Sequence, residues 1–335
     1  MRLPVAAASV MVLLDGSSSR GQMMRGPITA VDFKGQFSGH ETFPLRHLWL
    51  RKAFDAALKR GASRSVFTGP ESIVTFGVGK NMALAIRHWA LACEIIEEEG
   101  SAVRPTDLGI ALFGDEKPWD PYMERPATAW LVQWLVAGNP KMTTTWYWAF
   151  NHLSAQTFDH EALGRSVLDY CRHRQWARIA EKTVIRDVEC FIRSYVPRSD
   201  KAAGEDALEP VLAELGLIRS IGGRLYEFRR GPKPSLPDGV FAYALNAFWE
   251  RHATTASTLS VEAIAYEPGS PGRVFKLDEN SIVERLTTIE EVTHGKIVWS
   301  DSAGVRQVLR VKAINNPLSL LAQAYRSDHK KRRAA

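Results

Sequence analysis

The chain has 335 residues, of which 45% are hydrophobic and 24% charged, so it is long enough for two or three domains with apolar cores, and disorder is not the default. Its formal net charge of +6 weakly indicates a polyanionic partner. Three widely separated cysteines without CxxC spacing give no support for a zinc knuckle or a disulfide framework, and this pattern is typical of a cytoplasmic protein.

We expect residues 1–32 to be a disordered extension or a mis-assigned start, with Met23 or Met24 as the true initiator. The apolar run from Leu3 to Leu14 resembles a signal peptide, but a convincing cleavage site is missing. No stretch approaches the ~18 apolar residues of a membrane span, so a membrane partner is not expected.

Residues 33–115 are predicted to form a winged-helix-like DNA-binding domain. Thr42 is the expected N-cap of a helix that runs to about Arg60, and a second helix should span Lys80 to Cys93 after a glycine turn. Two short strands over 94–100 and 102–104 would form the wing. The predicted outer face of the second helix carries Lys80, Asn81, Leu84, Arg87 and His88. An ordinary helical bundle with a charged solvent face is the alternative.

Residues 116–197 are predicted to form a helical domain with a basic face. Asp159 should cap a helix that ends near His173, and a further helix should span Glu181 to Tyr195. The second of these helices carries a basic row, Lys182, Arg186 and Arg193, with Arg172, Arg174 and Arg178 just upstream. Such a row suits contact with phosphates, and a solvated helix face explains it equally well.

A polar linker over 197–205 is expected to precede a C-terminal winged-helix-like domain over 207–325. There, Asp278 should cap a helix, and the segments 295–300 and 305–311 should pair as a hairpin. Residues 326–335 form a basic tail. The predicted fold is therefore mainly α, with winged-helix-like units that carry small β-hairpin wings and are joined by a helical middle region.

The glycine turn before Lys80 resembles a nucleotide-binding loop but lacks two of its parts. Val74 stands where a P-loop needs glycine, and Asn81 stands where it needs a hydroxyl for magnesium. ATP is therefore not expected as a cofactor. A lysine beside backbone N–H groups at a helix start still suits a phosphate of DNA.

Candidate catalytic residues are His40, Glu41 and Arg46, which could act as a base, a metal ligand and a charge stabiliser in phosphodiester chemistry. The alternative is a capping and ion-pair arrangement before the first helix. A second acidic group could hold Mg²⁺, or could simply form a polar loop. Its members are Asp115, Glu116, Asp120 and Glu124. The residues alone predict a DNA binder and no nuclease.

Three sequence blocks together resemble a known bacterial family. They are FSGHETFPLR at 37–46, GVGKNM continuing to IRHW within 77–89, and GSPGRVFKL at 269–277. The chain is similar over residues 33–325 to the SspB-like DNA nickase family of DNA phosphorothioation systems, a family long labelled as a domain of unknown function.

This resemblance implies a component of a phage-defence system that nicks DNA so that sulfur can be incorporated. It also implies three protein partners: a cysteine desulfurase, an ATPase and an ATP-pyrophosphatase. If the protein is a nickase, cleavage would need Mg²⁺ where His40, Glu41 or the acidic group over 115–124 takes part. The DNA-binding residues expected from the sequence are Lys80, Asn81, Arg87, His88, Lys182, Arg186, Arg193 and Arg273. Two alternatives are a non-catalytic DNA-recognition adaptor and a winged-helix transcription regulator.

Overall fold

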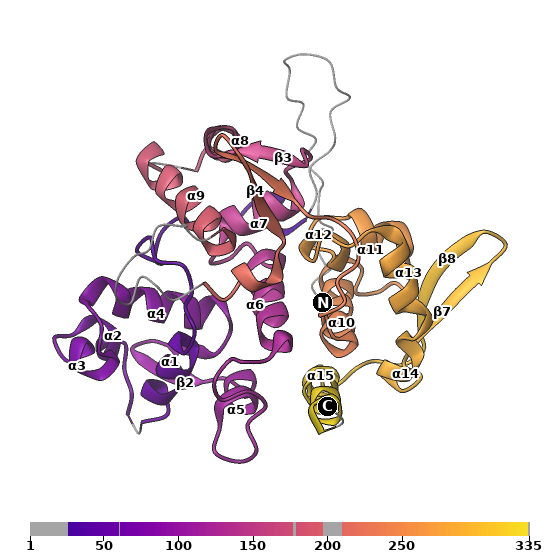
Figure 1. The fold of residues 1–335 in the computed structure, drawn as a ribbon, viewed down its shortest axis with the longest axis horizontal. Coiled ribbons are helices and arrows are strands. Elements are labelled where there is room, and N and C mark those ends of the chain that lie inside the picture. The colour runs from indigo at the N-terminus through magenta and orange to yellow at the C-terminus, as the bar shows by residue number, and fades with distance from the viewer. Residues whose placement is uncertain (1–25, 60, 177–178, 197–209, 334–335) are drawn as a thin grey trace, which may run out of the picture.

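The computed structural model describes residues 26–59, 61–176, 179–196 and 210–333 (Figure 1). Helices make up most of its regular structure, and the strands form small antiparallel sheets, which confirms the prediction of a mainly α protein. Most of the predicted N-terminal extension and the whole predicted linker lie outside the described residues. Among the residues described, none of the helices combines the length and apolar character that crossing a bilayer requires.

The N-terminal region is a group of short helices followed by a hairpin. Its elements are α1 (Trp49–Ala57), α2 (Ser65–Thr68), α3 (Ser72–Phe76), α4 (Lys80–Ala92), β1 (Ile96–Glu99), β2 (Ala102–Pro105) and α5 (Asp107–Phe113). The second helix and the hairpin were both predicted. The predicted start of the first helix is wrong, because α1 begins at Trp49 with Leu48 as its N-cap, and Thr42 lies in the loop before it.

The middle region contains two adjacent buried helices and a three-stranded sheet. Its elements are α6 (Pro126–Gly138), α7 (Thr144–Asn151), β3 (Thr157–Asp159), α8 (His160–His173), α9 (Glu181–Tyr195), η3 (Ala213–Leu215), β4 (Ile218–Gly222) and β5 (Leu225–Phe228). As predicted, the Asp159 side chain accepts from the N–H of Ala162 at the start of α8.

The sheet of the middle region has the strand order β3-β5-β4. Residues 218–228, predicted to belong to the C-terminal domain, therefore join this sheet, with β5 paired to β3 and β4 paired to β5. The predicted boundary near residue 197 does not separate two structural units, because this hairpin belongs with α8 and α9.

The C-terminal region repeats this order of elements. It contains α10 (Asp238–His252), β6 (Thr258–Ser260), α11 (Val261–Tyr266), α12 (Pro271–Val274), α13 (Glu279–Thr287), α14 (Ile289–Thr293), β7 (Ile297–Ser302), β8 (Val305–Arg310) and α15 (Leu318–Arg333). Its sheet order is β6-β8-β7, so the first strand again pairs with the second strand of the hairpin. The predicted hairpin and the Asp278 cap are confirmed, and residues 326–333 of the predicted tail continue α15.

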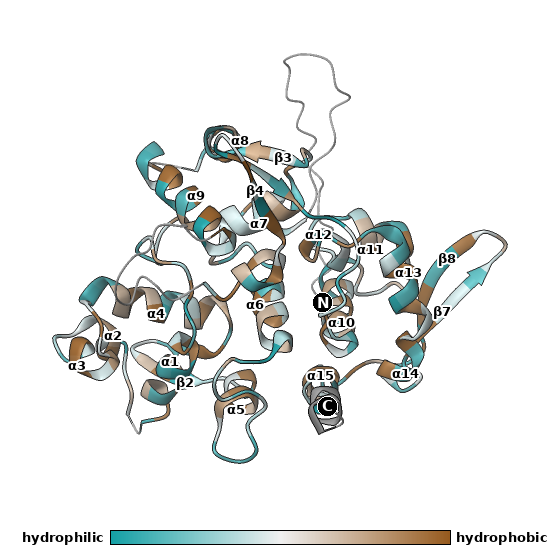
Figure 2. Cartoon of the chain, in the orientation of Figure 1, coloured by the Kyte–Doolittle hydropathy of each residue, from teal (hydrophilic) through white to brown (hydrophobic). Residues whose placement is uncertain are grey.

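The apolar core runs through the whole described fold, and its largest side chains are aromatic. Trp89, Trp130, Trp146 and Trp249 are among the fully buried residues, as expected for tryptophans that pack rather than bind. By contrast, α9 carries both hydrophilic and hydrophobic residues (Figure 2), which is the pattern of a helix with one buried and one exposed face.

Order begins before the predicted start at Phe33. Residues 27–29 form a short 3-10 helix, η1 (Pro27–Thr29), and Ile28 is buried. The Tyr170 hydroxyl donates to the Ile28 carbonyl at 2.9 Å, and Arg174 donates to the carbonyls of Thr29 and Ala30. This segment is therefore part of the fold rather than of an extension.

Candidate functional site

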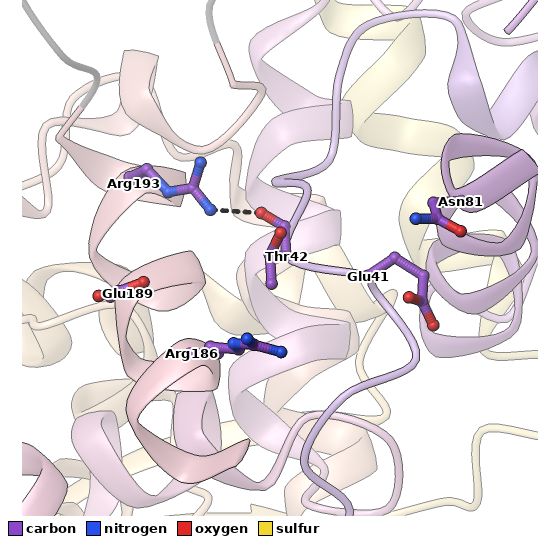
Figure 3. Close-up of a pocket in the computed structure, with 6 residues that line it drawn as sticks. All are labelled: Glu41, Thr42, Asn81, Arg186, Glu189 and Arg193. Atoms are coloured by element: carbon purple, nitrogen blue, oxygen red, sulfur yellow. Dashed lines mark hydrogen bonds between the residues drawn. The ribbon is translucent and has the colours of Figure 1, made fainter. Parts of the chain in front are cut away.

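A polar pocket with a volume of about 460 Å³ lies where the loop before α1 meets α4 and α9. Its lining residues are Glu41, Thr42, Asn81, Arg186, Glu189 and Arg193. Glu41 and Asn81 lie on one side and the three α9 side chains lie on the other, with Thr42 between them (Figure 3). The fold thus brings together residues that the sequence suggested separately as catalytic and as DNA-binding.

The loop over residues 38–42, hereafter the 38–42 loop, has an unusual backbone. Ser38, Glu41 and Thr42 have φ values of 97°, 48° and 66°, and Gly39 has a φ of 97°. Non-glycine residues rarely adopt positive φ, and each such residue costs on the order of 1–3 kcal/mol unless the surroundings impose it. Clusters of this kind occur at functional sites, where the strain holds side chains in place.

Side chains of helix α9 hold the 38–42 loop in place through hydrogen bonds. One carboxylate oxygen of Asp187 accepts from the Ser38 N–H at 3.1 Å and lies 2.5 Å from His40 Nε2. Arg193 donates from Nη2 to the Thr42 carbonyl. Asp187 and Arg193 bind the loop, and Glu189, which lies between them on α9, lines the pocket. The same helix therefore fixes the loop and forms one side of the pocket.

His40 is a buried positioning residue and does not line the pocket. The Thr42 N–H donates to Nδ1 at 3.0 Å, so the ring proton lies on Nε2 and is donated to Asp187. Burial lowers the pKa of His40, but Cys190 and Asp187 raise it more, and the net direction is upward. The sequence assignment of His40 as a catalytic base is not supported by this geometry.

His88 lies inside the molecule and not on the outer face of α4, so that part of the prediction is wrong. The side chain is 3% exposed, and its ring centroid is 5.5 Å from that of His40. Burial, together with His40 and Arg87, lowers the pKa of His88 to about 3, so the ring is neutral. A Cβ on Gly39 would come within 2.6 Å of His88 Nδ1, which explains why the loop approaches α4 at a glycine.

Arg87 is also engaged within the protein. Its Nε and Nη2 atoms each lie 2.6 Å from one carboxylate oxygen of Glu98 on β1, a bidentate pair that ties α4 to the hairpin. The expectation that Arg87 faces DNA is therefore contradicted by its geometry. Lys80 and Asn81, at the start of α4, are exposed as expected.

Two further predicted arginines lie away from the pocket. Arg46 is buried, with its guanidinium over the rings of Phe43 and Trp49 at 5.8 and 5.4 Å. Arg273 is half-buried in the C-terminal region and donates to the Tyr266 carbonyl at 2.9 Å. Neither lines the pocket beside Glu41.

The basic row predicted on α9 is present, and it is interrupted by an acidic residue, Glu189. Lys182 and Arg186 are exposed, and Glu189 is exposed between Arg186 and Arg193. Of the upstream arginines, Arg172 pairs with Asp169, and Arg178 lies outside the described residues.

Sequence reasoning missed Glu189 and Asp187. A signal for Asp187 was available, because this carboxylate stands on the buried stripe beside Val184 and Val188, where an acidic residue needs a partner.

The alternative acidic group does not form a metal site. The buried Asp120 carboxylate accepts from the N–H groups of Glu124 and Arg125 and from the Thr128 hydroxyl, so it fixes the start of α6. Asp115 and Glu116 are exposed. In the described part of the chain, no group of three or more histidine, cysteine, aspartate or glutamate residues could hold a metal ion. The interpretation as a polar loop fits this segment better.

A second pocket, of about 770 Å³, is acidic, whereas two arginines balance the two glutamates of the pocket at Glu41. Glu94, Glu97, Glu98 and Asp107 line this second pocket together with Lys141 and several apolar side chains. Excess negative charge makes this pocket unsuited to a phosphate group. The pocket at Glu41 is the better candidate for chemistry on nucleic acid.

The model of the DUF4007 family, described as a protein of unknown function, matches residues 37–325, so the chain belongs to this family. Its fold is similar to two solved structures, described as "Magnesium ion-bound SspB crystal structure" and "SspB crystal structure". Their TM-scores are 0.76 and 0.75, and each shares 28% identity and covers 90% of this chain and 89% of its own. The resemblance inferred from the three sequence blocks is thereby confirmed. A search of curated proteins gives no match.

Proposed function

We propose that this protein is the strand-nicking component of a DNA phosphorothioation system and that it acts on DNA in the pocket at Glu41. The observation that carries the proposal is the convergence of Glu41 and Asn81 with Arg186, Glu189 and Arg193 at one polar pocket. The similarity to SspB structures supports the same assignment. In this proposal the nick gives the sulfur-transferring partner enzymes access to the DNA backbone.

The charges of the pocket suit a phosphodiester. Arg186 and Arg193 would hold the phosphate, because guanidinium groups match phosphate geometry and remain charged. Arg193 Nε is buried and has no hydrogen-bond partner among the described residues, although Nη2 is used by Thr42. Hydrolysis joins a water oxygen to phosphorus and breaks one P–O ester bond, and the arginines would stabilise the charge that develops on the phosphate oxygens.

The pocket also offers oxygen ligands that fit Mg²⁺, the ion named for one of the similar SspB structures. Mg²⁺ keeps several waters and needs one or two carboxylates together with substrate phosphates. Glu41 would hold the ion together with Asn81, which lines the same side of the pocket (Figure 3). When bound, the ion would supply Lewis-acid polarisation of the phosphate.

The test is nicking of supercoiled plasmid by the purified full chain, with Mg²⁺ or with EDTA. We expect nicked circles with Mg²⁺, and a decrease on the order of 100-fold in nicking rate for Glu41→Gln. Glu116→Gln, which removes an exposed carboxylate from the alternative acidic group, is the matched control and should nick normally. If Glu41→Gln nicks at the wild-type rate, the proposed site is wrong.

A second candidate function is a DNA-recognition adaptor without catalysis. One observation favours it: in the described part of the chain, no group of three or more histidine, cysteine, aspartate or glutamate residues could hold a metal ion. Tight DNA binding by the wild-type protein without nicking, in both Mg²⁺ and EDTA, would support this function and exclude the first.

A further inference from the structure

The middle region has the order of elements found in a winged helix, although the sequence predicted it to be purely helical. Helix α7 is followed by the short strand β3, by α8 and α9, and by the β4–β5 hairpin. The sheet order β3-β5-β4 joins the first strand to the second strand of the hairpin. Helices α7, α8 and α9 pack against one another.

We propose that this unit reads duplex DNA, with α9 as the recognition helix in the major groove and the β4–β5 hairpin as the wing. In helix-turn-helix proteins the second helix of the pair enters the major groove, and α9 is that helix here. The inference deepens the proposed function, since it names duplex DNA as the substrate and a groove as the place of contact.

The exposed face of α9 carries the required side chains. Lys182, Arg186 and Glu189 are exposed and follow one another by about one turn. The opposite face is apolar and buried, so these side chains are directed away from the core. Arginine and lysine contact guanine edges and phosphates, and glutamate accepts from cytosine, so the face has the chemistry of base reading.

The tip of the hairpin adds a cation in the position of a wing. The turn holds Gly222, Gly223 and Arg224, and Arg224 is exposed with a φ of 62°. In the described part of the chain no ion pair involves Arg224, whereas Arg219 on β4 is paired with Glu227 on β5 at 2.5 Å. Arg224 can therefore contact a DNA phosphate, whereas Arg219 is engaged within the sheet.

The other two units that end in a β-hairpin lack such a face. On α4, Arg87 is bound to Glu98 and His88 is buried. On α13, Glu284 is exposed and Arg285 pairs with Asp238. The geometry therefore assigns duplex reading to α9, and the start of α4 faces the same pocket through Asn81.

The test measures binding of the full chain to a 30-base-pair duplex, to one of its strands alone, and to the same duplex with glucosylated 5-hydroxymethylcytosines. The glucose groups fill the major groove and leave the backbone unchanged. We expect the ordinary duplex to bind on the order of 10-fold more tightly than either of the other two DNAs. Equal affinity for the ordinary and glucosylated duplexes would overturn the inference.

Variants locate the contact on α9 and the hairpin. Lys182→Ala and Arg224→Ala should each weaken duplex binding roughly 5- to 10-fold. Arg165→Ala, which removes an exposed arginine of α8 that pairs with Glu161, is the matched control and should bind within about twofold. All three positions are at the surface, so unchanged thermal unfolding is expected. Wild-type affinity for Lys182→Ala would contradict the assignment of α9.

The experiments distinguish failure of this inference from failure of the proposed function. If α9 does not enter the major groove, the glucosylated duplex is bound normally while plasmid nicking still depends on Glu41. If the protein is not a nickase, groove-dependent binding persists while plasmid remains supercoiled.

Discussion

The units around α9 and α13 share one topology and differ in charge. Each has a helix, a short strand, further helices and a hairpin whose second strand pairs with the first strand of the unit. The outer face of α9 is basic at Lys182 and Arg186, whereas exposed residues of α13 and α14 include Glu284, Glu290 and Glu291. The difference teaches that topology does not decide function here; the side chains on the exposed helix do.

The comparison is tested most strongly by reversing charge on both helices. Lys182→Glu with Arg186→Glu should weaken duplex affinity about 100-fold, roughly tenfold for each reversed phosphate contact. Glu284→Lys with Glu290→Lys, measured by the same fluorescence anisotropy titration, should change it less than about threefold. Similar effects from the two pairs would remove the distinction between the units.

The buried carboxylate of the α9 unit should matter more for stability than any exposed group. Asp187→Ala leaves the Ser38 N–H and the His40 ring without their acceptor, so we expect a loss of about 2–4 kcal/mol in the free energy of unfolding. Urea denaturation measures it. The 38–42 loop should also lose its conformation, which would lower the nicking kcat more than it weakens DNA binding.

Two buried histidines should make stability depend on pH. Burial is the largest cause lowering the pKa of both His88 and His152 to about 3. Their folded pKa values lie below the unfolded value, so their neutral forms stabilise the fold above pH 6.5 and this stability is lost as pH falls toward 3. From pH 7 to pH 5 we expect a loss of roughly 2 kcal/mol per histidine.

Urea midpoints at pH 7 and pH 5 measure this loss. In His88→Gln the difference between the two pH values should shrink by about half, whatever the stability of the variant at pH 7. A difference as large as that of the wild type would contradict the assignment to His88.

The smallest expected effect concerns the corresponding helix of the C-terminal unit. The Asp278 side chain accepts from the Ser281 N–H at 2.8 Å and caps α13. Asp278→Ala should cost about 1 kcal/mol, as for other N-caps, and leave nicking unchanged. A loss of nicking as large as that of Asp187→Ala would show that the two units act together in catalysis.

The sequence predicted local features well. The bounds of α4, α8 and α9, the caps at Asp159 and Asp278 and the last hairpin all follow from periodicity and capping residues that act over a few positions. The wing of the middle unit was missed because β3 and β5 are far apart in the sequence, and no local pattern reports their pairing.

The candidate site was predicted as separate residues and not as an assembly. All four residues were predicted as site residues, but Glu41 was predicted to be catalytic, whereas Asn81, Arg186 and Arg193 were predicted to bind DNA. The conformation at Thr42 is imposed through His40 by Asp187, which lies 147 positions beyond His40, so capping rules failed at Thr42. His88 is buried because the 38–42 loop covers it, which the periodicity of α4 alone does not reveal.

The account depends on contact between the α9 face and the DNA backbone, and the salt dependence of binding tests it most directly. We predict that Lys182→Ala with Arg186→Ala lowers the slope of log affinity against log salt by about two, one for each lost phosphate contact. A slope equal to that of the wild type would mean that DNA binds elsewhere or that α9 meets a different partner.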